Sequence, residues 1–196
     1  MAEGIAKKYI EREGLADRIH VVSSGTLVGQ DDNLSDDRVR QILEHGVAYG
    51  WRGCILDQKR YSGDSAYKTE MRATAQRVLT TTLRPLDATF RELALQQIGI
   101  VYPHERKKTQ ARPDVDVILG VEQNHADAIQ DIYRDSGYYP TIDTLAQYAG
   151  RPEIIFPDAM GSLKIADYVA LRKKFEIVVP LAIQKALNDP QLSSRR

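Results

Sequence analysis

The fold is decided by the stretch Val115-Asp116-Val117-Ile118-Leu119-Gly120-Val121. Such a short and almost continuously apolar run is typical of a strand buried on both faces of a parallel sheet. A helix is predicted directly after it, with Asn124 as its cap and Gly137 at its end. The side chains expected to face inward from that helix are Ile129, Ile132 and Tyr133.

Shorter segments of the same kind lie on both sides of this strand. The runs at residues 19–22 and 153–156 are rich in β-branched and aromatic residues and are predicted as strands. Helices are predicted from Ala2 to Gly14, after Ser35, around residues 141–148, and after Ser162 to Pro190 with a kink at Pro180. Strands that alternate with helices indicate an α/β fold with a parallel sheet.

Residues 48–97 differ from the rest of the chain because no strand pattern occurs in them. Pro85 suits the first turn of a helix that carries Leu86, Phe90, Leu93 and Leu95, and another helix is predicted before it. We interpret 48–97 as a helical insertion within a single domain that spans residues 1–196.

The composition restricts the function classes. The 27 basic and 27 acidic residues give a net charge of zero, which argues against a general nucleic-acid binder. Cys54 is the one cysteine, so a disulfide framework is excluded and a reducing, cytoplasmic location is expected. The longest apolar stretch, residues 177–183, is too short to cross a membrane, and the first residues lack the apolar core of a signal peptide.

Several motifs occur in an order that resembles the low molecular weight protein-tyrosine phosphatase family. The resemblance covers nearly the whole chain apart from 48–97. Its most specific parts are the opening Met1-Ala2-Glu3 and the turn Ser23-Ser24-Gly25-Thr26. The matching segments are Met1-Ala2-Glu3-Gly4-Ile5-Ala6, Val22-Ser23-Ser24-Gly25-Thr26, Asp37-Arg38, His104-Glu105-Arg106-Lys107, Asp116-Val117-Ile118-Leu119-Gly120-Val121-Glu122 and Pro157-Asp158-Ala159-Met160-Gly161.

The resemblance implies a three-layer αβα fold and a phosphomonoester hydrolase that works through a cysteinyl-phosphate intermediate. It implies no cofactor and no metal, and its substrate would be a phosphorylated protein or a small phosphomonoester. A related thiol-dependent arsenate reductase would need further cysteines. No role in binding nucleic acid or membranes is expected.

One part of the family pattern does not occur in the 196 residues. In the family, a central strand and a Cys-x5-Arg-Ser phosphate-binding loop precede the helix that begins Met-Ala-Glu. We therefore expect no phosphatase activity from the chain by itself. Two explanations remain open: a misplaced start at Met1, which we favour because the cut falls at a methionine, or a degenerate protein whose insertion repairs the sheet. In the second case the protein would be a non-catalytic binding or regulatory module.

The resemblance assigns roles to three residues. Asp158 would be the general acid that protonates the leaving oxygen and later activates water. Ser23 and His104 would brace the phosphate loop by hydrogen bonds, and Lys107 stands where arginine is usual. Without the resemblance, these residues would be a turn aspartate, a turn serine and a surface histidine. Residues 159–161 depart from the family pattern, so the substrate-binding residues are unknown.

Cys54 and the four histidines are two further candidates for a functional site. Cys54 and Arg60 satisfy Cys-x5-Arg, but the residues between them contain no glycine and include Asp57, which would repel a phosphate. We interpret Cys54 as a structural cysteine. The four histidines show no paired ligand spacing, so no metal site is predicted.

Overall fold

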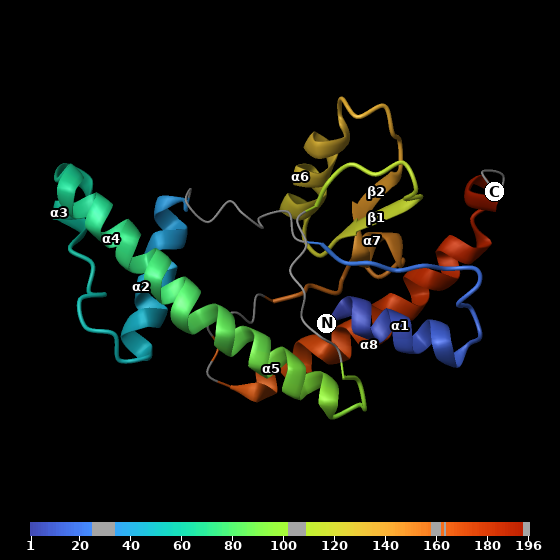
Figure 1. The fold of residues 1–196 in the computed structure, drawn as a ribbon, viewed down its shortest axis with the longest axis horizontal. Helices are drawn as coiled ribbons and strands as arrows, with labels where there is room; N and C mark the ends of the chain where they lie inside the picture. Colours follow the sequence, from blue (N-terminus) through green and yellow to red (C-terminus); the bar gives the residue numbers. More distant parts are fainter. Residues whose placement is uncertain (25–33, 102–108, 158–161, 163, 194–196) are drawn as a thin grey trace.

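A computed structural model describes residues 1–24, 34–101, 109–157, 162 and 164–193. Helices predominate, and two short strands form a parallel sheet (Figure 1), so the fold is broadly α/β. The elements in chain order are α1 (Ala2–Arg12), α2 (Asp36–Ala48), α3 (Gln58–Gly63), α4 (Ser65–Val78), the π-helical η1 (Leu79–Leu83), α5 (Arg84–Gln96), β1 (Val117–Gly120), α6 (Gln123–Tyr133), β2 (Thr141–Thr144), α7 (Leu145–Tyr148), α8 (Ile165–Asn188) and α9 (Pro190–Ser193).

The apolar stretch at 115–121 does form a strand, β1, as its sequence predicts. It pairs in parallel with β2, in the register Val117 to Thr141, and α6 connects the two. The helix predicted over 141–148 is wrong in its first half. Residues 141–144 pair with β1, and Thr144 then accepts a hydrogen bond from the Gln147 amide (3.3 Å) and so caps the short α7.

Two predicted strands are not strands. Residues 19–22 and 153–156 have no ladder partner among the described residues. Ile154 instead donates its amide to the Arg151 carbonyl (3.0 Å), and the Ile155 carbonyl accepts from Lys174 of α8 (2.6 Å). A short β-rich run becomes a strand only where a neighbouring strand supplies hydrogen bonds, which local sequence does not reveal.

The predicted helix ends are partly confirmed. Ser35 caps α2 by accepting from the Arg38 amide (3.2 Å), and α1 begins without a side-chain cap. Gly14 follows α1 with a φ of 65°, which suits a residue just after a helix end. Helix α2 continues through Gly46 to Ala48. Asn124 does not cap α6, which begins one residue earlier at Gln123.

The segment 48–97 is helical from Gln58 onward, and α4, η1 and α5 follow one another as a long rod in Figure 1. Pro85 lies inside this rod instead of starting an isolated helix. Proline has no N–H to donate to the carbonyl four residues earlier. The turn before it is π-helical, and there the Arg84 amide donates to the Leu79 carbonyl five residues back. Of the apolar residues that this helix carries, Leu95 is buried whereas Leu93 is 44% exposed, and the polar Asp87 is buried as well.

The buried apolar side chains form two clusters. The α2–α4 cluster is drawn from α2 to η1, and the main cluster is drawn largely from α1, α5, α7 and α8. The α2–α4 cluster consists of Val39, Ile42, Leu43, Cys54, Tyr61, Tyr67, Met71, Ala75, Val78, Leu79 and Leu83. The main cluster consists of Ile5, Ala6, Ile10, Ala94, Leu95, Ile100, Leu145, Ala146, Tyr148, Phe156, Tyr168, Leu171, Phe175, Val178, Val179, Ala182 and Ile183. Whether both belong to one domain stays a prediction.

The long helix α8 crosses the main cluster and ends before Pro190, as predicted, with Pro180 in its interior. Ser162 does not cap it directly, because the helix begins at Ile165, but its hydroxyl bonds to the Asp167 carboxylate. Over the described ranges, no helix combines the length and the apolar character that a membrane crossing requires.

The side chain of Asp36 connects α2 to α3 and α4, and these contacts predict that the stability of the protein depends on pH. Its carboxylate accepts from Lys68 (2.7 Å), Tyr61 (3.0 Å) and Arg72, and the Lys68 bond is the first cause that lowers the pKa of Asp36 to about 2. The pKa of Asp36 in the folded state lies below its value of about 3.9 in the unfolded chain. The ionised Asp36 carboxylate therefore makes its full contribution to folding stability above about pH 3.9. It is lost as the pH falls through about 2.

Acid unfolding followed at several pH values would check this expectation. Asp36→Asn should flatten the dependence of stability on pH below about pH 4. Asp37→Asn is the matched control, because Asp37 is the neighbouring carboxylate and pairs with Arg40 on the surface (3.2 Å). Equal acid profiles for wild type and Asp36→Asn would contradict the assignment.

Candidate functional site

The start of α1 is held in a polar environment. Glu3 is buried, with 8% of its surface exposed, and accepts hydrogen bonds from the Ser23 amide (3.0 Å) and the Ser23 hydroxyl. Lys7 pairs with the other oxygen of Glu3 (2.8 Å). The segment after residue 18 is thereby attached to the first turn of α1. The two most specific motifs of the sequence, Met1-Ala2-Glu3 and Ser23-Ser24, lie side by side.

A second contact fixes the same segment on its other side. The hydroxyls of Ser24 and Thr109 lie 2.8 Å apart, and Thr109 is buried. Three stretches that are distant in sequence, near residues 1, 23 and 109, therefore meet at one end of α1. Figure 1 shows the N-terminus at the start of α1, which runs alongside α8.

Helices α5 and α8 add a buried polar group beside the start of α1. Asp87 of α5 is 4% exposed and pairs with Arg91 one turn later (Nε to Oδ2, 2.8 Å). Tyr168 of α8 is completely buried, and its ring stacks on Phe90 with centroids 5.2 Å apart. Apart from each other, the Oδ1 atom of Asp87 and the hydroxyl of Tyr168 have no hydrogen-bond partner among the described residues.

The charges of these groups act on one another. Burial, and next the charge of Arg91, lower the pKa of the Met1 amino group to about 6, and the carboxylates of Glu3 and Asp87 oppose the shift. Burial also raises the pKa of the Tyr168 hydroxyl, and the negative charge of Asp87 and a hydrogen bond to this carboxylate act in the same direction. Met1 also packs against the main cluster. The start of α1, Asp87, Arg91 and Tyr168 therefore form one site, which we call the α1 polar site.

The structure places only one of the three predicted site residues. Ser23 lies in the α1 polar site, bonded to Glu3. Asp158 and His104 are outside the described residues, as is Lys107. Ser162, four residues after Asp158, is described, and its carbonyl accepts from the Tyr49 hydroxyl (3.4 Å).

Sequence reasoning missed Glu3, Asp87, Arg91 and Tyr168 as members of a site. For Asp87 and Arg91 a signal existed, because an acid and a base four residues apart share a helix face with Ala94 and Leu95. The apolar residues on the other side of α5 indicated a packing helix, so the Asp87–Arg91 pair was not recognised as part of a site. Tyr168 gave no signal, since a tyrosine on an apolar helix face is normally a packing residue.

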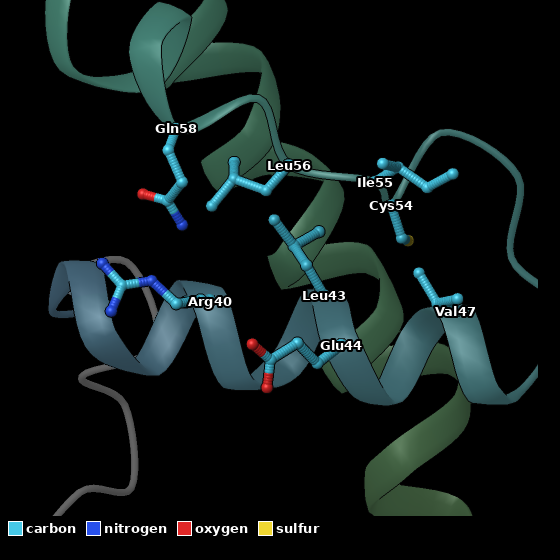
Figure 2. A pocket seen from close by; sticks show the side chains of 8 residues that line it. All are labelled: Arg40, Leu43, Glu44, Val47, Cys54, Ile55, Leu56 and Gln58. Atoms are coloured by element: carbon cyan, nitrogen blue, oxygen red, sulfur yellow. The ribbon is translucent and has the colours of Figure 1, made fainter.

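Cys54 lies at a separate groove, shown in Figure 2. The groove has a volume of about 370 Å³ and lies between α2 and the chain leading into α3. It is lined by Arg40, Leu43, Glu44, Val47, Cys54, Ile55, Leu56 and Gln58. Cys54 is 1% exposed, and burial raises the pKa of its thiol, which disfavours the thiolate.

The geometry around Cys54 does not suit phosphate chemistry. Arg60 does not meet the thiol; its guanidinium covers the ring of Tyr67, 4.3 Å from the centroid, and it pairs with Asp64 (3.5 Å). An ideal Cβ built on Gly46 would lie 2.8 Å from the Cys54 sulfur, so the thiol fills the space that this glycine leaves. These contacts support the structural interpretation of Cys54.

Candidate metal ligands do not gather in the part of the chain that the structure describes, where no group of three or more His, Cys, Asp or Glu side chains could hold an ion. Comparisons of the chain with protein-family models, with curated proteins and with solved structures found no match.

Proposed function

We propose that residues 1–196 are the larger part of a phosphomonoester hydrolase resembling the low molecular weight protein-tyrosine phosphatases. The observation that carries the proposal is the contact between Glu3 and Ser23 at the uncapped start of α1. A helix start offers backbone N–H groups and a positive dipole to an anion. The resemblance puts the phosphate of the substrate at this end of the helix, and Ser23 beside it.

The environment of β1 supports the proposal independently. Its apolar residues Val117, Ile118 and Leu119 are only half-buried, although such a run is typical of strands covered on both sides. In the described residues β1 has one strand neighbour, β2, so its other edge has no partner strand. A strand placed before α1 would pair there and cover this surface. The complete sheet would then have the three-layer αβα arrangement.

The chemistry divides between this chain and a loop before Met1. The loop would supply the thiolate that attacks phosphorus, with its amides and the start of α1 holding the phosphate oxygens. Asp158 would protonate the leaving oxygen and then activate the water that releases phosphate. Ser23 and His104 would orient the loop. No cofactor is needed, the substrate is a phosphorylated protein or a small phosphomonoester, and we place the protein in the cytoplasm.

The alternative is a non-catalytic binding or regulatory module. The groove beside Cys54 favours this alternative, because Ile55 is 80% exposed and Val47 46% exposed at its edge. Exposed apolar side chains around a groove are common at protein interaction sites. A module of this kind would need neither the loop nor Asp158.

The reading frame upstream of Met1 separates the two functions. A strand followed by Cys-x5-Arg-Ser-Pro in frame would support the hydrolase, and a stop codon directly before Met1 would rule it out. In the extended protein, we expect replacement of the loop cysteine to abolish turnover of p-nitrophenyl phosphate. Asp158→Asn should slow it much less, because this leaving group needs little protonation.

The matched control for Asp158→Asn is a substrate with a poorer leaving group, such as phenyl phosphate. Its turnover should fall more than that of p-nitrophenyl phosphate, because the acid is then required. Equal losses on both substrates, in variants with the circular dichroism spectrum of the wild type, would contradict the role of Asp158.

A further inference from the structure

The side chain of Ile55 projects from the chain that leads into α3. It is 80% exposed, whereas Cys54 before it is 1% exposed and Leu56 after it is partly buried. The hydroxyl of Tyr67 in α4 donates to the Ile55 carbonyl (3.5 Å) and accepts from the Asp57 amide (3.0 Å), and Asp57 also caps α3. The backbone on both sides of Ile55 is therefore held in place, so little conformational freedom is lost when its side chain enters a contact.

The apolar groove lies directly beside this projecting side chain. Its walls include Leu43 and Val47 of α2 and, on the opposite side, Cys54 and Leu56. Figure 2 shows Leu43 and Val47 pointing from α2 toward that opposite wall. The volume of about 370 Å³ is larger than one isoleucine side chain, and the lining has the apolar character that favours burying such a side chain. A projecting apolar side chain and an apolar groove thus lie next to each other on one surface.

The charges near these two features are opposite in sign. At the groove, Arg40 pairs with Asp37 (3.2 Å), whereas the Glu44 carboxylate forms no hydrogen bond or ion pair with a described residue. The basic side chains of Arg52 and Lys59 flank the projecting isoleucine in sequence, are exposed, and likewise have no such partner in the part of the chain that the structure describes. The segment around the isoleucine therefore offers positive charge, and the edge of the groove offers negative charge.

We propose that the groove receives Ile55 of a second copy of this chain, in a dimer with two-fold symmetry. In such a dimer both copies use the same surface, so every contact occurs twice. Ile55 of one copy enters the groove of the other, and Arg52 and Lys59 approach Glu44 of the partner subunit. A surface that carries both the projecting side chain and the groove, with opposite charges beside them, is complementary to itself. This self-complementarity favours a second copy over an unrelated peptide as the occupant.

The surface is accessible to a second copy, and its size predicts a weak dimer. Figure 1 shows α3 at the end of the rod α4–η1–α5 that is remote from α8. Two side chains in two grooves cover much less than the about 800 Å² per partner of a standard interface, so we expect a dissociation constant of about 100 µM. The dimer goes beyond the proposed function, since it requires neither an upstream loop nor Asp158.

Sedimentation velocity of the 196-residue chain between about 5 µM and about 500 µM tests the proposal. We expect the wild type to change from monomer to dimer across this range. Ile55→Ala should weaken the self-association about a hundredfold, roughly tenfold for each of the two side chains withdrawn from a groove. Ile155→Ala is the matched control, because Ile155 is 75% exposed but does not line the groove, and it should leave the association unchanged.

A mixture of two variants identifies the contact itself. Val47→Lys places an ammonium group in the groove, where it blocks the incoming side chain and repels the basic residues around it, so this variant alone should stay monomeric. Mixed with Ile55→Ala, it should form a heterodimer, because one intact groove and one intact Ile55 remain. The heterodimer should be about tenfold weaker than the wild-type dimer and about tenfold tighter than either variant alone.

Three outcomes would overturn the proposal: a wild type that stays monomeric throughout, an undiminished dimer in Ile55→Ala, or a mixture that associates no better than its separate components. Ile55 and Val47 are both exposed, so the variants should keep the circular dichroism spectrum of the wild type. If Val47→Lys does not fold, Gln58→Trp blocks the groove from another exposed position of its lining and repeats the mixing experiment.

Discussion

Replacing Leu43 with alanine is expected to destabilise the α2–α4 cluster by about 3 kcal/mol and to leave the main cluster largely folded. Leu43 is 1% exposed and packs where α2 meets α4. Truncating a buried leucine removes its transfer free energy and leaves a cavity. We expect a local effect because the two clusters share no buried residue and are joined mainly by the rod α4–η1–α5.

The single tryptophan makes this result measurable. Trp51 belongs to the α2–α4 side, where its indole donates to Thr82 (3.1 Å), so its fluorescence reports that cluster. Far-ultraviolet circular dichroism reports the helices of both clusters. In Leu43→Ala, the fluorescence transition in urea should move to lower concentration and separate from the circular dichroism transition.

The matched control lies in the main cluster. Phe175→Ala removes a side chain that stacks on Phe156, with ring centroids 4.6 Å apart, and is 4% exposed. This variant should move the circular dichroism transition to a lower urea concentration and shift the Trp51 fluorescence transition much less. If both variants move both transitions together, the chain unfolds as one cooperative unit, and the expectation of separate units is wrong.

Gly120→Ala is expected to destabilise the protein by about 2 kcal/mol, although alanine is normally preferred over glycine. A Cβ at this position would lie 2.7 Å from the Ala126 amide nitrogen and 3.0 Å from the Glu122 carbonyl oxygen. Both are backbone atoms, one at the cap of α6 and one in its first turn, so relief requires the whole helix start to move. Overpacking of this kind outweighs the gain in chain entropy, which is below about 1 kcal/mol.

Gly63→Ala serves as the control for this prediction. Gly63 lies in α3, and nothing is within 4 Å of the position its Cβ would take. The same chemical change should therefore be neutral or stabilise by up to about 1 kcal/mol. Thermal unfolding of the two variants gives the comparison. A Gly120→Ala variant as stable as the wild type would show that α6 can shift away from β1.

The elements that could be predicted from sequence are those whose signals are local. The β1 strand follows from its apolar run, the start of α2 from Ser35, and the end of α8 from Pro190. For the strands expected at 19–22 and 153–156 the local signal misled, because a strand also needs a neighbour that pairs with it. The burial of Asp87 in α5 was not predicted either, because it depends on the ion pair with Arg91 and on the helices packed around it.

The residues of the candidate site also divide into those with a local sequence signal and those that only long-range packing brings together. Ser23 was singled out by a motif, and the structure bonds it to Glu3 in the first turn of α1. Asp87 and Tyr168 belong to helices about 80 residues apart in sequence, and nothing in the local pattern of either helix marks them as a pair. Only the packing of α5 on α8, through the ring stack of Phe90 and Tyr168, brings them to the start of α1.

By itself, the sequence determined a neutral α/β chain with one cysteine, a helix beginning at its first residues, one apolar strand and a helical stretch over 48–97. These properties depend on composition and on residues close together in the chain. The tertiary structure decided that α2 packs on α4, that Cys54 is buried, and that Glu3, Asp87 and Tyr168 surround the start of α1. Long-range contacts decide such features, because burial and pairing depend on which distant segment arrives as a neighbour.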